Sequence, residues 1–314
     1  MTAALSSQSA VERPGLAPAA LRAALAAGNA IMEVYAGDFA VDYKDDQSPL
    51  THADRAAHRC IVDGLQATGL PVLSEEGAPT AYGIRRDWPA FWLVDPLDGT
   101  KEFVQRNGDF TVNIALIERG RPVLGVVYAP AHQDLYIGAR GWGAVRATGP
   151  EISQWPENFA AGLPVAGQGI PPFTALVPGG DDPDGPLRVV ASRSHGTPAT
   201  DAFLARLRTF GRGVELVSRG SALKLCMVAS GEAHLYPRLA PTMEWDTAAA
   251  QAVVEGAGGR VVVYDDAAQA AFMEIGPEAL FAAPSLAYNR GNLRNPWFVA
   301  LHPSIARHTE MPAP

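Results

Sequence analysis

The sequence is poor in cysteine, has fewer basic than acidic residues and lacks a long apolar run. Its 314 residues include two cysteines, Cys60 and Cys226, both in helix-like apolar surroundings, which predicts core thiols in a reducing compartment. A net charge of −8 argues against binding a nucleic-acid polymer through a basic surface. No apolar run approaches the about 18 residues of a membrane span, and residues 1–15 lack a signal-peptide layout. We therefore expect a cytoplasmic protein, while peripheral association with the inner membrane stays open.

Several common catalytic motifs are also missing. The chain has no Gly-rich phosphate loop, no zinc-type Cys/His cluster and no G-x-S-x-G nucleophile elbow. His52, His58 and His132 show no metal-ligand spacing. Any active site must therefore be built from other groups, and the acidic residues are the first candidates.

The most informative stretch is FWLVDPLDGT, residues 91–100. Its apolar start, Phe91–Val94, predicts a short buried strand, and Asp95, Asp98 and Thr100 follow directly. Carboxylates at the exit of a buried strand destabilise a protein unless positive charge compensates them. A divalent cation that prefers oxygen ligands is the natural partner. The alternative is a Pro/Gly turn whose aspartates cap the next helix.

A second predicted strand also ends in carboxylates. Residues 71–74 precede Glu75-Glu76, and if this strand lies beside the first, Glu75 and Asp95 project from the same sheet edge. Upstream, Thr51 and Asp54 form a T-x-x-D pattern that helix capping explains. Asp46 lies in the loop before that cap and has no local structural role, which makes it a functional candidate.

The coarse pattern predicts an α/β chain with an α+β first part and an α/β second part. Helices are expected over 16–35 and after Thr51, followed by an antiparallel meander over 110–148. Residues 149–186 are rich in Pro and Gly and predict a surface insertion or domain junction. Strands and helices then alternate, and the tail from Asn292 is expected to end loosely. We predict two parts, residues 1–186 with the metal-binding motif and residues 187–314 for substrate.

Polar residues in the second part add to the candidates. Ser221 and Lys224 are three apart at the start of a short predicted helix, and Lys is seldom buried without a partner. His195 follows a predicted strand and could bind phosphate or lie on the surface. Asp246 precedes a small-residue helix expected over 247–257, where capping is a sufficient explanation.

Together these residues resemble a known family. Glu75-Glu76, WLVDPLDGT and EWDTAA with Gly258-Gly259 resemble the three-part signature of the inositol monophosphatase superfamily of Mg²⁺-dependent, lithium-sensitive phosphatases. Within it, KEF at 101–103, SRSH at 192–195, GSALK at 220–224 and YPR at 236–238 are most similar to the CysQ-type 3′(2′),5′-bisphosphate nucleotidases of sulfur metabolism. Ala222 departs from the serine common at that position, and the 149–186 stretch is longer than the family needs. The resemblance implies a layered αβαβα sandwich, with a homodimer left open.

The resemblance also assigns roles. It implies one Mg²⁺ on Glu75, Asp95 and the Leu97 carbonyl, a second on Asp95, Asp98 and Asp246, and a third, weaker ion near Glu75. Asp46 would contribute to the third ion through water. Asp46 and Thr100 would orient the attacking water, and Glu75 is the third implied catalytic residue. The implied substrate contacts are Leu97, Asp98, Gly99, Thr100, His195, Ser221, Lys224, Arg238 and Asp246.

The resulting expectation is metal-assisted hydrolysis of a phosphomonoester. The substrate would be 3′(2′)-phosphoadenosine 5′-phosphate, or its 5′-phosphosulfate, a small bisphosphorylated nucleotide. An inositol or sugar-phosphate phosphatase is the alternative of the same class. A non-catalytic protein that binds metal or nucleotide is the alternative outside it, and the Asp46–Thr100 pair counts against that, because a binder needs no water activation.

Overall fold

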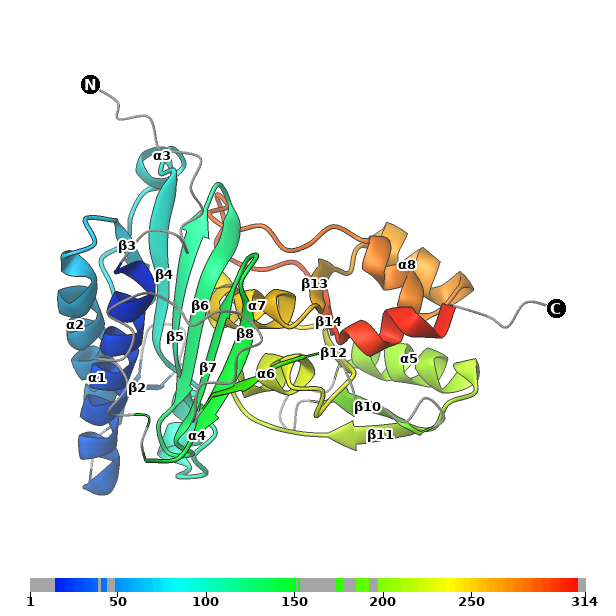
Figure 1. Ribbon diagram of the computed structural model, residues 1–314, viewed down its shortest axis with the longest axis horizontal. Coiled ribbons are helices and arrows are strands. Elements are labelled where there is room, and N and C mark those ends of the chain that lie inside the picture. Colours follow the sequence, from blue (N-terminus) through cyan, green and yellow to red (C-terminus); the bar gives the residue numbers. More distant parts are fainter. Residues whose placement is uncertain are drawn as a thin grey trace.

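The chain forms five alternating layers of helices and sheets (Figure 1). The computed structural model describes residues 15–38, 41–43, 49–150, 152, 173–177, 185–191 and 197–309. An outer helix layer, a seven-stranded sheet, a middle helix layer, a five-stranded sheet and a second outer helix layer follow one another (Figure 1). This arrangement confirms the predicted αβαβα sandwich. The helices of the three layers are α1 (Leu16–Ala36) and α2 (His52–Gln66), then α6 (Leu223–Ala229) and α7 (Glu244–Gly256), then α5 (Pro198–Leu207) and α8 (Asp266–Glu274).

The seven-stranded sheet is the predicted meander with one parallel strand added at its edge. Its strands, in spatial order, are β3 (Val72–Ser74), β4 (Ala90–Asp98), β5 (Thr111–Glu118), β6 (Arg121–Ala129), β7 (Asp134–Ala139), β8 (Gly143–Thr148) and β9 (Phe173–Ala175). The pairs from β4 onward are antiparallel, whereas β3 runs parallel to β4 with Ser74 opposite Val94. Glu75, directly after β3, and Asp95, near the end of β4, therefore lie next to each other at the same end of two adjacent strands, as predicted. β9 falls within the expected insertion, so part of that segment extends the sheet.

The five-stranded sheet contains a strand that the sequence did not predict. Its strands are β11 (Val214–Val217), β10 (Leu187–Val190), β12 (Leu235–Arg238), β14 (Phe298–Leu301) and β13 (Arg260–Val263), in spatial order. β14 is buried and pairs antiparallel with both β12 and β13. No strand was predicted in the tail from Asn292, of which only the end was expected to be loose, so β14 is a feature that the sequence pattern missed. A run this short, preceded by Pro296, carries too little periodicity to distinguish a strand from a loop.

Short elements complete the described chain. β1 (Val41–Tyr43) pairs antiparallel with β2 (Pro49–Thr51), and α3 (Tyr82–Arg85) precedes β4. α4 (Thr100–Val104) follows β4 directly. The rings of Tyr35, Phe103 and Phe110 contact one another with centroids 5.0–5.2 Å apart, which fixes α4 against the end of α1. Three 3₁₀ helices span Arg208–Phe210, Pro277–Ala282 and Pro303–Thr309.

The middle helix α7 lies unusually close to the first sheet. It packs against β5, β6 and β7, and it presents small residues such as Ala249. A Cβ on Gly125 would stand 2.0 Å from the Ala249 carbonyl oxygen, and one on Gly138 would stand 2.3 Å from the Val253 Cα. Glycine is therefore required at both strand positions, because only hydrogen fits under the helix backbone. This close approach brings the first turn of α7, with Asp246, to the sheet that carries Asp95 and Asp98.

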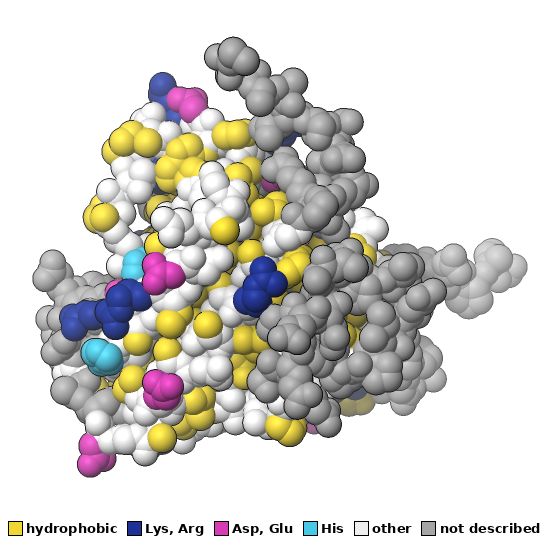
Figure 2. All heavy atoms as spheres, turned by 60° about the vertical axis from the view of Figure 1, so that its left-hand side comes forward, with side chains coloured by type: hydrophobic (Ala, Val, Ile, Leu, Met, Phe, Trp, Pro, Cys, Tyr) yellow, Lys and Arg dark blue, Asp and Glu magenta, His cyan; other side chains and the backbone are white. Residues whose placement is uncertain are grey.

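The outer face of the α1–α2 layer shows no field of one charge sign where the described residues form it. In Figure 2 acidic and basic side chains are interspersed there, with hydrophobic side chains scattered between them. None of the described helices is long and apolar enough to cross a membrane. The cytoplasmic location, the homodimer and the division of the chain at residue 186 stay predictions.

Substitution of Gly138 tests the packing of α7 on the sheet. We expect Gly138→Ala to lower the free energy of unfolding by about 3 kcal/mol or more, because the added methyl meets helix backbone that has no room to shift. Gly83→Ala is the matched control, since its Cβ would meet nothing within 4 Å, and it should stay within about 1 kcal/mol of wild type. Thermal and urea unfolding followed by circular dichroism measure both. Equal stability of the two variants would contradict the close packing.

Candidate active site

The DPLDGT motif forms an irregular end of β4 rather than a free loop. Asp95 pairs with Asn113 and Asp98 with Thr111, so one more residue lies between the two aspartates than between their partners. Such a bulge suits Pro96, which has no N–H to give to the sheet. The Asp95 Oδ1 accepts the Leu97 N–H at 3.0 Å, which closes a tight turn at the bulge. Asp95 and Asp98 are thereby held at one end of the sheet.

The motif then turns directly into α4. Gly99 has φ of 93°, a left-handed conformation that favours glycine, and α4 begins at the next residue. The Thr100 hydroxyl lies 3.3 Å from the Leu97 carbonyl oxygen, which is one of two acceptors within reach of its single proton. Strand, bulge and helix therefore present the Asp95 and Asp98 carboxylates, the Leu97 carbonyl and the Thr100 hydroxyl within one short segment.

Four acidic residues from three elements converge at this point. Burial raises the pKa of Asp95 well above its usual range, and the negative charges of Glu75, Asp98, Asp246 and Asp54 raise it further. Burial likewise raises the pKa of Asp246, and the charge of Asp98 raises it further. The hydrogen bond from the Met243 N–H opposes the shift. The predicted ligands Glu75, Asp95, Asp98 and Asp246 thus lie close enough to repel one another. Unless cations compensate them, the ionised forms of Asp95 and Asp246 are destabilised.

The donor set of the cluster fits a hard divalent cation. Asp95, Asp98 and Asp246 each use one oxygen to accept hydrogen bonds, the shortest from Leu97 N, Ser221 Oγ and Met243 N at 3.0, 2.7 and 2.8 Å. Within the described residues no protein donor reaches the second oxygen of any of the three. In the same part of the chain, no group of three or more His, Cys, Asp or Glu side chains is arranged to hold an ion as it stands. The match to Mg²⁺ therefore rests on the type and the charge of the donors, since Mg²⁺ takes carboxylate and carbonyl oxygens together with water.

Asp246 is not placed as the sequence suggested. It was expected just before its helix, but α7 begins at Glu244, so Asp246 is the third residue of the helix. Its Oδ2 accepts the Met243 N–H at 2.8 Å. The capping explanation holds for one oxygen only, and the other is left to face the cluster.

Asp54 is a site residue that the sequence reasoning missed. The capping box is confirmed, because Asp54 Oδ2 accepts the Thr51 N–H at 2.7 Å and Thr51 Oγ1 accepts the Ala53 N–H at 3.2 Å. The other Asp54 oxygen accepts the Thr100 hydroxyl at 3.2 Å. Burial raises the pKa of Asp54, opposed by the bonds from Thr51. The T-x-x-D pattern was explained fully by capping, so no sequence signal remained for this second contact.

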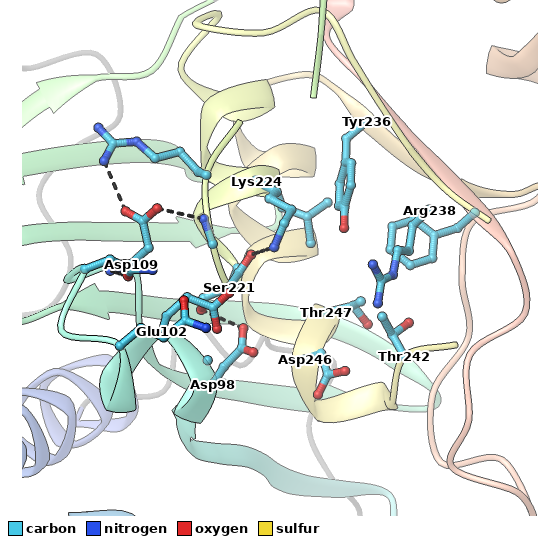
Figure 3. Close-up of a pocket in the computed structure, with 18 residues that line it drawn as sticks. Asp98, Glu102, Asp109, Ser221, Lys224, Tyr236, Arg238, Thr242, Asp246 and Thr247 are labelled. Carbon is cyan, nitrogen blue, oxygen red and sulfur yellow. Dashed lines mark hydrogen bonds and ion pairs between the residues drawn. The ribbon is translucent and has the colours of Figure 1, made fainter. Parts of the chain in front are cut away.

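A cavity of about 260 Å³ opens beside the cluster, between the first sheet and the second part of the chain (Figure 3). Of the predicted substrate residues, it is lined by Asp98, Gly99, Ser221, Lys224, Arg238 and Asp246. Lys224 Nζ donates to the Ser221 carbonyl at 3.1 Å, and Arg238 Nη2 donates to the Pro241 carbonyl at 3.0 Å. The Arg238 Nε is buried and has no hydrogen-bond partner among the described residues. Acidic groups of the cluster and cations therefore share one cavity.

Some predicted residues lie elsewhere. Leu97, Thr100 and Glu75 do not line the cavity. Asp46 and His195 lie outside the described residues. Conversely, Glu102, Asp109 and Arg219 line the cavity without having been predicted as site residues. Only Glu102 had a sequence signal, the KEF that follows the DGT motif.

Comparison with known proteins agrees with this architecture. The model of the inositol monophosphatase family matches residues 15–294. A 3′(2′),5′-bisphosphate nucleotidase CysQ of Salmonella typhimurium is 45% identical over 239 residues, which cover 75% of this chain and 85% of that protein. The CysQ of Escherichia coli K12 is 44% identical with the same coverage.

Solved structures give the same result. The crystal structure of CysQ from Bacteroides thetaiotaomicron, described as a bacterial member of the inositol monophosphatase family, superposes with a TM-score of 0.73 at 42% identity. The match covers 93% of this chain and 99% of that one. The suhB protein of Bartonella henselae shares the fold, with a TM-score of 0.62 at 22% identity, over 94% and 98% of the two chains. Sequence, fold and comparisons agree that the chain belongs to the inositol monophosphatase family.

Proposed function

We propose that this protein is a Mg²⁺-dependent 3′(2′),5′-bisphosphate nucleotidase. It removes the 3′(2′)-phosphate from 3′(2′)-phosphoadenosine 5′-phosphate and yields AMP and inorganic phosphate. The observation that carries the proposal is the cavity in which the carboxylates Asp98 and Asp246 face the cations Lys224 and Arg238 (Figure 3). Such a cavity suits a substrate with one phosphate to be cleaved over a metal cluster and a second phosphate to be held by cations. The CysQ relatives support this assignment.

The carboxylate cluster would hold the metal ions. In this proposal Glu75, Asp95 and the Leu97 carbonyl hold one Mg²⁺, Asp95, Asp98 and Asp246 hold a second, and Glu75 contributes to a third. When bound, Mg²⁺ supplies positive charge that favours ionisation of water and stabilises negative charge on the leaving oxygen. The four carboxylates carry a formal charge of −4, so two Mg²⁺ ions would balance them and a third would leave positive charge for an anionic substrate.

The protein groups that orient the attacking water are Thr100 and a carboxylate. The sequence reasoning paired Thr100 with Asp46, but the described contact is between Thr100 Oγ1 and Asp54 Oδ1. A carboxylate that accepts from Thr100 fixes its hydroxyl, whose lone pairs then face the water to be positioned. We therefore propose Asp54 as the partner of Thr100, while the role of Asp46 stays a prediction from the resemblance.

Recognition of the second phosphate falls to the cations of the cavity. Lys224 is partly buried and its ammonium group is held by the Ser221 carbonyl, which leaves two of its N–H donors for a ligand. Arg238 has one buried guanidinium nitrogen, Nε, that finds no acceptor within the described part of the chain. Such groups attract an anion locally, as a chain of net charge −8 requires. His195 is proposed from the resemblance alone to join them.

Release of inorganic phosphate tests the proposed function. With Mg²⁺ present, 3′-phosphoadenosine 5′-phosphate should be hydrolysed much faster than inositol 1-phosphate. Removal of Mg²⁺ with a chelator should stop both reactions. Asp98→Asn should abolish turnover while its circular dichroism spectrum stays that of wild type. Equal rates on both substrates would indicate a broader phosphatase, and nucleotide binding without phosphate release would indicate a non-catalytic protein. Activity of Asp98→Asn at saturating Mg²⁺ would contradict the metal assignment.

Asp54→Asn tests the water-orienting pair. The amide keeps the size of the side chain but cannot accept from Thr51 and Thr100 together, so kcat should fall by about 100-fold or more. Thr51→Ala is the matched control, since it removes capping bonds at a cost of about 1 kcal/mol in stability but leaves the Asp54 carboxylate in place. Its kcat should stay close to wild type. If the two variants lose kcat equally, Asp54 acts through the helix cap and not through Thr100.

Lys224→Ala tests recognition of the second phosphate. Removal of this cation should raise KM for 3′-phosphoadenosine 5′-phosphate more than KM for a substrate with a single phosphate, because only the first presents an additional anion. Lys101→Ala is the control, since Lys101 is exposed and does not line the cavity. Steady-state kinetics with both substrates would measure the difference. An equal rise in both KM values would argue against a bisphosphate site.

A further inference from the structure

Asp109, in the loop between α4 and β5, is a buried carboxylate whose two oxygens are both used. Oδ2 accepts the Gly220 N–H at 3.0 Å, and Oδ1 accepts Arg219 Nη1 at 3.2 Å and His132 Nε2 at 3.0 Å. Only 7% of the side chain is exposed. Burial opposes its ionisation, but the donors from His132, Gly220 and Arg219 outweigh burial and lower the pKa of Asp109. Asp109 is therefore a negatively charged hydrogen-bond acceptor that its donors hold in a fixed position (Figure 3).

The loop that contains Asp109 and the segment that contains Gly220 pack together without space for a side chain at residue 220. A Cβ on Gly220 would stand 2.6 Å from the Asp109 carbonyl oxygen and 2.7 Å from its Cβ, so glycine alone fits there. The next residue, Ser221, has φ of 51°, which costs a non-glycine residue about 1 kcal/mol or more. Ser221 keeps this conformation because the segments on either side of it are fixed, and Gly220 is fixed by Asp109.

The strained Ser221 points its hydroxyl at the carboxylate cluster. Its Oγ donates to Asp98 Oδ2 at 2.7 Å and lies 2.5 Å from Thr111 Oγ1. That bond engages one oxygen of Asp98, while no described protein donor reaches the other. A continuous series of hydrogen bonds and one peptide thus leads from Asp109 through Gly220 and Ser221 to Asp98.

We infer that Asp109 is a positioning residue that sets the orientation of Asp98 through Gly220 and Ser221 and thereby the affinity of the site for its metal. The inference rests on the proposed function, in which Asp98 is a metal ligand. Hydrogen bonds that orient a ligating carboxylate typically change metal affinity by about 10- to 100-fold. The hydrogen bonds of Asp109 go to His132, Arg219 and Gly220 and not to the four carboxylates of the cluster, so its effect should be on metal binding and not on the chemical step.

The test is binding of Mn²⁺ to the substrate-free protein, in which electron paramagnetic resonance measures the concentration of free Mn²⁺. Asp109→Asn should weaken Mn²⁺ binding about tenfold, because a single amide oxygen cannot serve Gly220, Arg219 and His132 together. The kcat of this variant should recover at saturating Mg²⁺. Asp134→Asn is the matched control, since Asp134 is a largely buried carboxylate paired with Arg146 at 2.8 Å and does not line the cavity. It should lose thermal stability to a similar degree and keep the wild-type Mn²⁺ affinity.

A double-mutant cycle separates transmission through Ser221 from a general loss of structure. Ser221→Ala should weaken Mn²⁺ binding as Asp109→Asn does, and the two together should cost no more than either alone. If Asp109→Asn does not fold, Gly220→Ala replaces it in the test. The added methyl forces the two segments apart while Asp109 is intact, and Mn²⁺ binding should again weaken. Additive effects, or wild-type Mn²⁺ affinity in Asp109→Asn or Gly220→Ala, would overturn the inference. Asp98→Asn distinguishes the two failures: if it loses Mn²⁺ while Asp109→Asn does not, only the inference fails, and if it too keeps wild-type affinity, the proposed metal site fails with it.

Discussion

Mutual repulsion among buried carboxylates is the constraint on which the rest of this structure depends. Asp95 lies almost fully buried at the end of β4, and the charges of Glu75, Asp98, Asp246 and Asp54 all act on it. This gathering of acids is unfavourable for stability, since burial and neighbouring charges destabilise the ionised forms of Asp95 and Asp246. The cluster is therefore interpretable only together with cations, and the fold is arranged so that oxygen atoms of three elements meet where those cations would bind.

Two features of the backbone make this gathering feasible. Gly125 and Gly138 let α7 lie directly on the first sheet, which brings Asp246 to the end of β4. Two positive-φ residues lie beside Asp98. Gly99 follows it in the chain, and the strained Ser221 contacts it from a distant segment. Around the acids, Lys224 and Arg238 supply positive charge inside the cavity. A chain with net charge −8 can therefore attract a doubly phosphorylated substrate without a basic surface.

The sequence predicted well the features that a local pattern records. The apolar run before Asp95 and the acids after two strands were enough to predict β3, β4 and the adjacency of Glu75 and Asp95. Features that depend on distant contacts were not predictable. Asp54 satisfied a helix cap, so its second contact with Thr100 left no trace in the spacing. Asp109 matters only because the fold places Arg219 and Gly220 against it, 110 and 111 residues further along the chain. β14 was missed because tertiary pairing, and not its own periodicity, makes it a strand.

The ionisation of Asp95 and its response to metal are the most direct test of the carboxylate cluster as a metal site. Carbon-13 NMR of the aspartate carboxyl groups, titrated with and without Mg²⁺, measures both in the same protein. Without Mg²⁺ the pKa of the Asp95 carboxyl should lie well above the usual 3.8, and saturating Mg²⁺ should lower it steeply as the cations compensate the cluster. An ordinary pKa in both conditions, or a raised pKa that Mg²⁺ leaves unchanged, would contradict the proposal that this cluster is a metal site.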